Sequence, residues 1–185
     1  MLWGDAMNTW MLTPDALREP WRLWACHLAH HSWQHAADNF LGLSIPLILV
    51  PRKDRGRLMF WLFLLAPALS LALIPSLHGG TFEGISGLAC AAWALVGLHL
   101  LVQEDSLPVG LAMLGLLGLK FTVESMTGSG LLFHEGRWQI VSESHLYGAL
   151  LGLSAGMADE TFRKLGRKVR CCATRRLRKL VMVPR

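Results

Sequence analysis

Long apolar stretches alternate with short polar segments along this chain. Residues 58–77 carry no ionisable side chain over about 20 positions, the length that an α-helix needs to cross about 30 Å of hydrocarbon. This stretch predicts one membrane-spanning helix. Four more stretches are of similar length but include polar residues: 26–50, 84–102, 107–126 and 143–160. The pattern therefore predicts an all-α fold, a polytopic membrane helix bundle with five spans.

Charged segments between these stretches predict the orientation and the division of the chain. Residues 51–57 form a basic loop, which the positive-inside rule assigns to the cytoplasm. Residues 1–24 mix tryptophans with charged side chains, as interfacial segments do. We expect an interfacial amino-terminal segment at 1–24, a transmembrane core at 25–162 and a basic cytoplasmic tail at 163–185, with the amino terminus outside.

Composition and charge narrow the class of protein. Hydrophobic residues make up 52% of the chain and charged residues 17%, a balance typical of membrane proteins. The net charge of +5 would suit a nucleic-acid binder, but ten of the eighteen basic residues lie within 163–185, where they suit anionic lipid headgroups. We therefore expect the lipid bilayer, and no nucleic acid, as a partner. The four cysteines show no CxxC spacing, and nothing in the chain predicts a cofactor.

Polar residues inside the predicted spans are the candidates for function, because such groups are costly in lipid. One helical face of the first predicted span carries His31, His35, Asn39 and Gly42. This face fits either packing hydrogen bonds between helices or a functional groove. Lys120 and Glu124 are four residues apart on the fourth predicted span and are spaced to form an ion pair. We interpret that pair as structural rather than catalytic.

The segment Gly84-Ile85-Ser86-Gly87 puts a hydroxyl at the outer start of the third predicted span. A serine between glycines is either a packing device or a nucleophile. The last predicted span begins near His145, and its glycines let a neighbouring helix come close. For Ser86 and His145 to meet, the glycine-rich turn at 75–83 has to dip into the protein, which is tolerated where a turn lines a cavity.

If Ser86 and His145 are in contact, they could together attack a peptide bond. His145 would take the proton of Ser86 and return it to the leaving amine. His35, Asn39 and the backbone N–H of Ser86 would supply donors for the oxyanion of a tetrahedral intermediate. A dyad without a carboxylate is workable, since packing alone can fix an imidazole.

The order and spacing of these motifs resemble the rhomboid intramembrane serine proteases. The matching residues are Trp21-Arg22, His30, Ser32, His35 and Asn39, then Gly84-Ile85-Ser86-Gly87, then His145-Leu146-Tyr147-Gly148 and Gly152. The His-rich opening, the Lys120 and Glu124 pair and the motif around His145 are most similar to the rhombosortase branch. The resemblance implies a rhomboid-like fold with Ser86 as nucleophile and His145 as general base. It also implies His35 and Asn39 as oxyanion donors, and Gly84, Gly87, Gly148 and Gly152 as supporting glycines.

The resemblance further implies a substrate and a location. Rhombosortases are associated with exported bacterial proteins that end in Gly-Gly, a transmembrane segment and a basic tail, the GlyGly-CTERM signal. We therefore expect a protease of the bacterial inner membrane that cleaves such tails, with its active site toward the outer side. Glycine suits the cut because it costs least to unwind from a helix. Common bacterial rhomboids have a further span before the Trp-Arg motif, whereas only residues 1–20 precede it here. Either the true start lies upstream and adds a helix, or this member works with five spans, and we expect five spans in the chain as given.

Two other readings remain open at this point. His27, His31 and His35 lie at i, i+4 and i+8, a spacing that can share a zinc or copper ion, although no clear carboxylate or cysteine ligands accompany them apart from Asp38. We therefore favour no metal. The second is a non-catalytic rhomboid-like protein that binds transmembrane helices. Such proteins usually lack the serine or the histidine, whereas this chain retains both.

Overall fold

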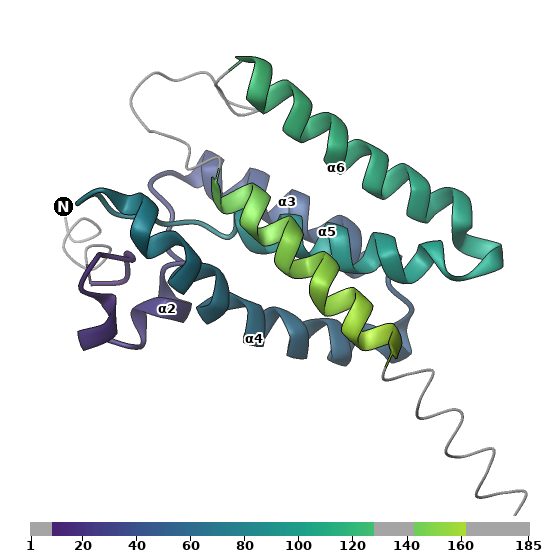
Figure 1. Cartoon of the computed structure of the whole chain (residues 1–185), viewed down its shortest axis with the longest axis horizontal. Helices are drawn as coiled ribbons and strands as arrows, with labels where there is room; N and C mark the ends of the chain where they lie inside the picture. The colour runs from purple at the N-terminus through teal and green to yellow at the C-terminus, as the bar shows by residue number, and fades with distance from the viewer. Residues whose placement is uncertain (1–8, 128–142, 162–185) are drawn as a thin grey trace, which may run out of the picture.

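Helices form nearly all the regular structure in the computed structural model, which describes residues 9–127 and 143–161 (Figure 1). The long helices are α3 (Trp33–Leu49), α4 (Arg55–Leu73), α5 (Ser86–Leu101), α6 (Leu107–Thr127) and a last helix over 143–161. The short ones are η1 (Ala16–Arg18), α2 (Arg22–Ala25), η2 (Arg52–Asp54), η3 (Ile74–Leu77) and η4 (Glu104–Ser106). Leu12 and Phe82 form an isolated antiparallel bridge. The predicted all-α class is confirmed.

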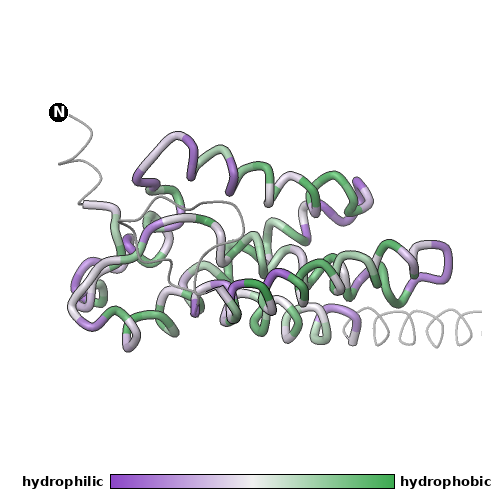
Figure 2. Tube along the Cα trace, turned by 90° about the horizontal axis from the view of Figure 1, so that it is seen from above, coloured by the Kyte–Doolittle hydropathy of each residue, from purple (hydrophilic) through white to green (hydrophobic). Residues whose placement is uncertain are grey.

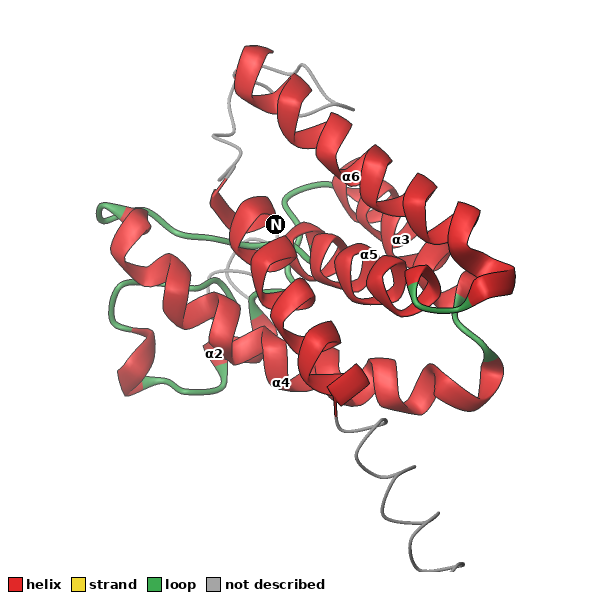
Figure 3. Cartoon of the chain, turned by 45° about the vertical axis from the view of Figure 1, so that its right-hand side comes forward, coloured by secondary structure: helices red, strands yellow, loops and turns green. Residues whose placement is uncertain are grey.

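Helix α5 is the buried centre of the bundle. It packs against α3, α4 and α6, and the last helix lies across it (Figures 1 and 3). Small residues allow the closest of these contacts. A methyl group on Gly148 would overlap the carbonyl oxygen of Gly87, and one on Gly152 would overlap that of Ala91. The backbones of α5 and the last helix therefore touch, as the glycine pattern predicts.

Two segments among the described residues are long and apolar enough to cross a membrane. They are Arg52–Leu77, which contains α4, and Glu104–Thr127, which contains α6. Helix α5 is apolar but shorter, so the five predicted spans are confirmed only in part. Figure 2 shows hydrophobic residues along the helices and hydrophilic ones at several of the turns that join them. Large apolar side chains such as Phe60, Phe63 and Leu119 are exposed there, which suits contact with lipid.

The first described residues are fastened to the rest of the bundle. Leu12 is fully buried, and its backbone exchanges two hydrogen bonds with Phe82, of 2.9 and 3.0 Å. The side chain of Arg22 donates to the carbonyl oxygen of Met11 at 2.9 Å and forms an ion pair with Glu19. These contacts hold residues 11–22 against the loop that leads into α5.

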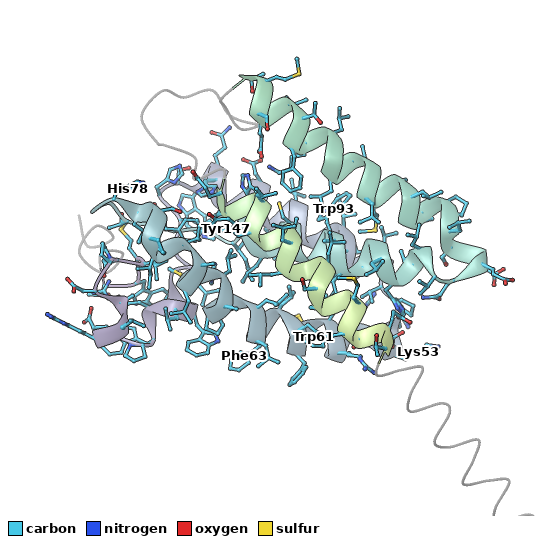
Figure 4. All side chains as sticks on the ribbon, viewed as in Figure 1. Lys53, Trp61, Phe63, His78, Trp93 and Tyr147 are labelled. Atoms are coloured by element: carbon cyan, nitrogen blue, oxygen red, sulfur yellow. The ribbon has the colours of Figure 1, made fainter. Side chains whose placement is uncertain are left out.

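Polar contacts fasten the last helix at the opposite end of the bundle. The carboxylate of Asp159 accepts hydrogen bonds from Arg57 and from Trp61, the latter at 2.8 Å. Glu160 pairs with Nδ1 of His99 at 2.6 Å. Figure 4 shows Trp61 and Lys53 at one end of the molecule and His78 at the other. The last helix is thus anchored to α4 and α5 far from Ser86.

Candidate active site

Ser86 is the first residue of α5 and is half-buried. The backbone before it is held firmly. Gly84 has φ of +114°, a conformation that favours glycine, and its N–H donates to the carbonyl oxygen of Cys26 at 2.9 Å. Because the first N–H groups of a helix have no intrahelical partner, the hydroxyl of Ser86 lies among free backbone donors. The loop into α5 is therefore held against other parts of the chain, as the predicted inward turn requires.

Ser86 and His145 each lie one residue from a backbone contact where α5 and the last helix cross. A methyl group on Gly87 would lie 2.8 Å from the carbonyl oxygen of Ser144, and one on Gly148 would overlap the carbonyl oxygen of Gly87. The two residues that flank these contacts are Ser86 and His145. Within the described ranges the Oγ of Ser86 makes no hydrogen bond to the imidazole, and such bonds are often long before substrate binds.

The other side of His145 meets two charged residues of α6. Its Nδ1 is 3.0 Å from Oε2 of Glu124 and 3.0 Å from Nζ of Lys120. Lys120 and Glu124 also pair with each other, as their spacing predicts. Sequence reasoning missed the contact between Glu124 and His145, which are 21 residues apart. The available signal was a carboxylate within an otherwise apolar span, which is costly unless it has a partner.

His35 and Asn39 of α3 lie over the backbone that precedes Ser86. A methyl group on Gly84 would lie 2.9 Å from Cε1 of His35 and 3.4 Å from Nδ2 of Asn39. That amide nitrogen is buried and has no hydrogen-bond partner within residues 9–127 and 143–161. His35 also interacts electrostatically with His145. The structure therefore brings all four predicted site residues into one neighbourhood.

The histidine-rich segment departs from the predicted helical face. Ser32 caps α3 by accepting a hydrogen bond from the backbone N–H of His35 at 3.1 Å, so the helix begins at Trp33. His27 and His31 precede it, and the predicted i, i+4 and i+8 alignment was wrong. His27 instead lies 3.0 Å from the carbonyl oxygen of Ala66 through Nε2. In the described part of the chain, no group of three or more His, Cys, Asp or Glu residues is placed to hold a metal ion.

Burial raises the pKa of Glu83, which lies in the loop before α5. Nδ1 of His31 is 3.5 Å from Glu83 and 3.0 Å from Nδ1 of His35. His31 therefore lies between the loop that leads into α5 and the first turn of α3.

Comparison with protein families agrees with this geometry. The family model described as the rhomboid domain matches residues 17–160, which is most of the chain and includes every candidate site residue. The chain belongs to the rhomboid family. Rhomboids are membrane proteins and serine intramembrane proteases, so this rhomboid is assigned at family level to the hydrolases. No curated protein and no solved structure matches the chain.

The four supporting glycines of this rhomboid lie in two places, one before α5 and three at its crossing with the last helix. Gly84 takes the left-handed backbone conformation and leaves room for His35 and Asn39. Gly87 and Gly148 form the contact beside Ser86, and Gly152 repeats it one turn further along against Ala91. Each glycine thus acts on the spacing of the site and not on the chemistry itself.

Proposed function

We propose that this rhomboid is an endopeptidase with Ser86 as nucleophile and His145 as general base. The observation that supports the proposal most is the backbone contact between Gly87 and Gly148, because it joins the helix ends that carry Ser86 and His145. A serine needs an adjacent base to attack a peptide bond, and an imidazole at that crossing meets the need. His35 and Asn39, on the other flank of the same loop, are the proposed oxyanion donors.

The reaction is acyl transfer in two steps. The proton of the Ser86 hydroxyl passes to Nε2 of His145 as Oγ bonds to the carbonyl carbon of the substrate. Collapse of the tetrahedral intermediate breaks the C–N bond, and the same proton leaves on the amine. Water then attacks the acyl-enzyme, giving its proton to His145, and the carboxylic acid leaves while Ser86 regains its hydrogen. The developing oxyanion is bound by Asn39, His35 and the first N–H groups of α5.

The proposed substrates are exported bacterial proteins whose carboxy-terminal tails hold Gly-Gly, a transmembrane segment and basic residues. The similarity of the sequence motifs to the rhombosortase branch supports this class. The proposed location is the inner membrane, with the loop 51–57 in the cytoplasm and Ser86 toward the outer side. All five predicted segments would then lie within the bilayer, and α5 would begin below its surface.

Cleavage of a reporter protein that carries such a tail tests the proposal in proteoliposomes. Ser86→Ala and His145→Ala should each abolish cleavage, while Ser44→Ala, on the exposed part of α3, should leave it intact. A fluorophosphonate should label Ser86 and no other residue. Retained binding of the tail by Ser86→Ala fits the protease. A Ser86→Ala protein that supports normal maturation of the reporter would instead show a non-catalytic binder.

A further inference from the structure

Glu124 has a second partner that its charge does not require. The residue is buried near the end of α6, where a lone carboxylate would be costly. Lys120, one helical turn earlier, already neutralises it. The additional contact to Nδ1 of His145, at 3.0 Å, joins α6 to the helix that carries the proposed base. Charge balance therefore explains the contact of Glu124 with Lys120 but not its contact with His145.

This contact determines which nitrogen of His145 carries the proton. An ionised carboxylate only accepts hydrogen bonds, so Nδ1 must be the donor toward Glu124. The lone pair then lies on Nε2, the nitrogen that a general base must present to a serine. Within the described ranges no hydrogen bond occupies Nε2. Lys120 Nζ is equally close to Nδ1, but a bond from Lys120 to Nδ1 would put the proton on Nε2 and disable the base.

Two physical reasons favour a hydrogen bond from Nδ1 of His145 to the Glu124 carboxylate over one from the Lys120 ammonium to Nδ1. The bond from Nδ1–H to Glu124 is charge-assisted, and it strengthens as the imidazole becomes positive during the reaction. Lys120 has its own bond to the other carboxylate oxygen. The remaining titratable groups that face this pair are Cys90 of α5 and His35 of α3, and neither is bonded to His145.

We infer that Glu124 is a positioning residue for His145, which makes Ser86, His145 and Glu124 a catalytic triad with Lys120 as its counter-charge. The inference rests on the proposed function. When the Ser86 proton reaches Nε2, Glu124 stabilises the imidazolium through Nδ1–H and does not itself take the proton. The Nε2 proton then goes to the leaving amine. The predicted dyad without a carboxylate is thereby extended by one residue.

The experiment compares Glu124→Gln, Glu124→Asp and Lys120→Met with the exposed control Glu104→Gln in proteoliposomes. Glu124→Gln should lower kcat on the order of 10³-fold, because its amide can donate to Nδ1 and favour the wrong tautomer. In the pH profile of kcat/KM for Glu124→Gln, the acidic limb should move to lower pH, because the charged imidazole of His145 loses the carboxylate that stabilises it. Glu124→Asp should recover at least a tenth of the rate, and Glu104→Gln should match the original protein.

A measurement on the unaltered protein covers the case in which variants fold poorly. Nitrogen NMR of His145 at neutral pH should show the proton on Nδ1, and a proton on Nε2 would overturn the inference. So would a fully active Glu124→Gln protein with an unshifted pH profile, or a Lys120→Met protein that alone loses the rate. Ser86→Ala, assayed in parallel, separates the two proposals: if it still cleaves the reporter, the proposed function itself fails.

Discussion

Asn39 carries a buried amide whose nitrogen has no hydrogen-bond partner in the described chain. Leaving a donor unpaired costs about 1 to 3 kcal/mol, so such a group is usually retained for a ligand. It lies against Gly84, two residues before Ser86, and we propose that it donates to the oxyanion formed by attack of that serine. His35 stands beside it, and its Nδ1 is 3.0 Å from Nδ1 of His31, which leaves Nε2 of His35 as the nitrogen without that contact.

Asn39→Ala should lower kcat by about 10²-fold with little change in KM, because the lost bond forms mainly in the transition state. Steady-state cleavage of the tail reporter in proteoliposomes measures both constants. The matched control is Ser44→Ala on the same helix. A rise in KM with unchanged kcat would mean that Asn39 binds substrate and does not stabilise the oxyanion.

The sequence allows Ser86 and His145 to be predicted because each lies in a glycine-flanked motif. The ion pair of Lys120 with Glu124 also follows from their spacing, since residues four apart on a helix are neighbours. The contact of Glu124 with His145 does not follow, because it depends on how two helices pack. Spacing along one helix reports partners on that helix only.

At the scale of the elements, backbone contacts hold α5 and the last helix together where they cross. Gly87, Gly148 and Gly152 could be recognised as packing residues from their positions, and the structure confirms the close approach. Helix α3 was harder to place. Its apolar pattern suggested a start near residue 26, but Ser32 caps the helix and moves its start to Trp33. Serine is a preferred capping residue, so this signal was present in the sequence.

Gly148→Ala should destabilise the protein by roughly 3 kcal/mol and remove activity, because the added methyl group meets the carbonyl oxygen of Gly87. The measurement is unfolding in detergent, followed together with reporter cleavage. Gly118→Ala on α6 is the matched control, since a methyl group there meets nothing within 4 Å. Equal stability of the two variants would show that the helices are not in backbone contact.

At the scale of the whole molecule, the two ends of the bundle have different roles. One end holds Ser86, and the other holds the polar anchors of Asp159 and Glu160. The basic loop 51–57 lies at the anchor end, where Arg57 pairs with Asp159, so the positive-inside rule predicts that this end faces the cytoplasm. Sequence predicts this orientation, but composition could not reveal the anchors because they join residues that are 61 to 102 positions apart.

Cysteine labelling in intact cells tests the orientation with two exposed positions at opposite ends, Lys53 and His78. In a chain whose Cys171 and Cys172 are serine, His78→Cys should react with an impermeant maleimide from outside. Lys53→Cys should react only after the membrane is opened. The reverse pattern would invert the proposed topology.

Asp159→Ala should lower the free energy of unfolding by about 1 to 3 kcal/mol, because the indole N–H of Trp61 loses its acceptor. Unfolding in detergent measures this change. The pH profile of cleavage should keep its shape, since the anchor is remote from His145. A shifted profile would indicate that the far end of the helix influences the base directly.

The contact between Gly87 and Gly148 joins main chain to main chain, so the spacing of the two backbones that carry the alcohol and the imidazole does not depend on the side chains around them. Selection for new target sequences can therefore alter the residues that line the substrate's route without retuning the reactive pair. A protein engineer could therefore change substrate recognition without changing the spacing of the backbones that carry Ser86 and His145.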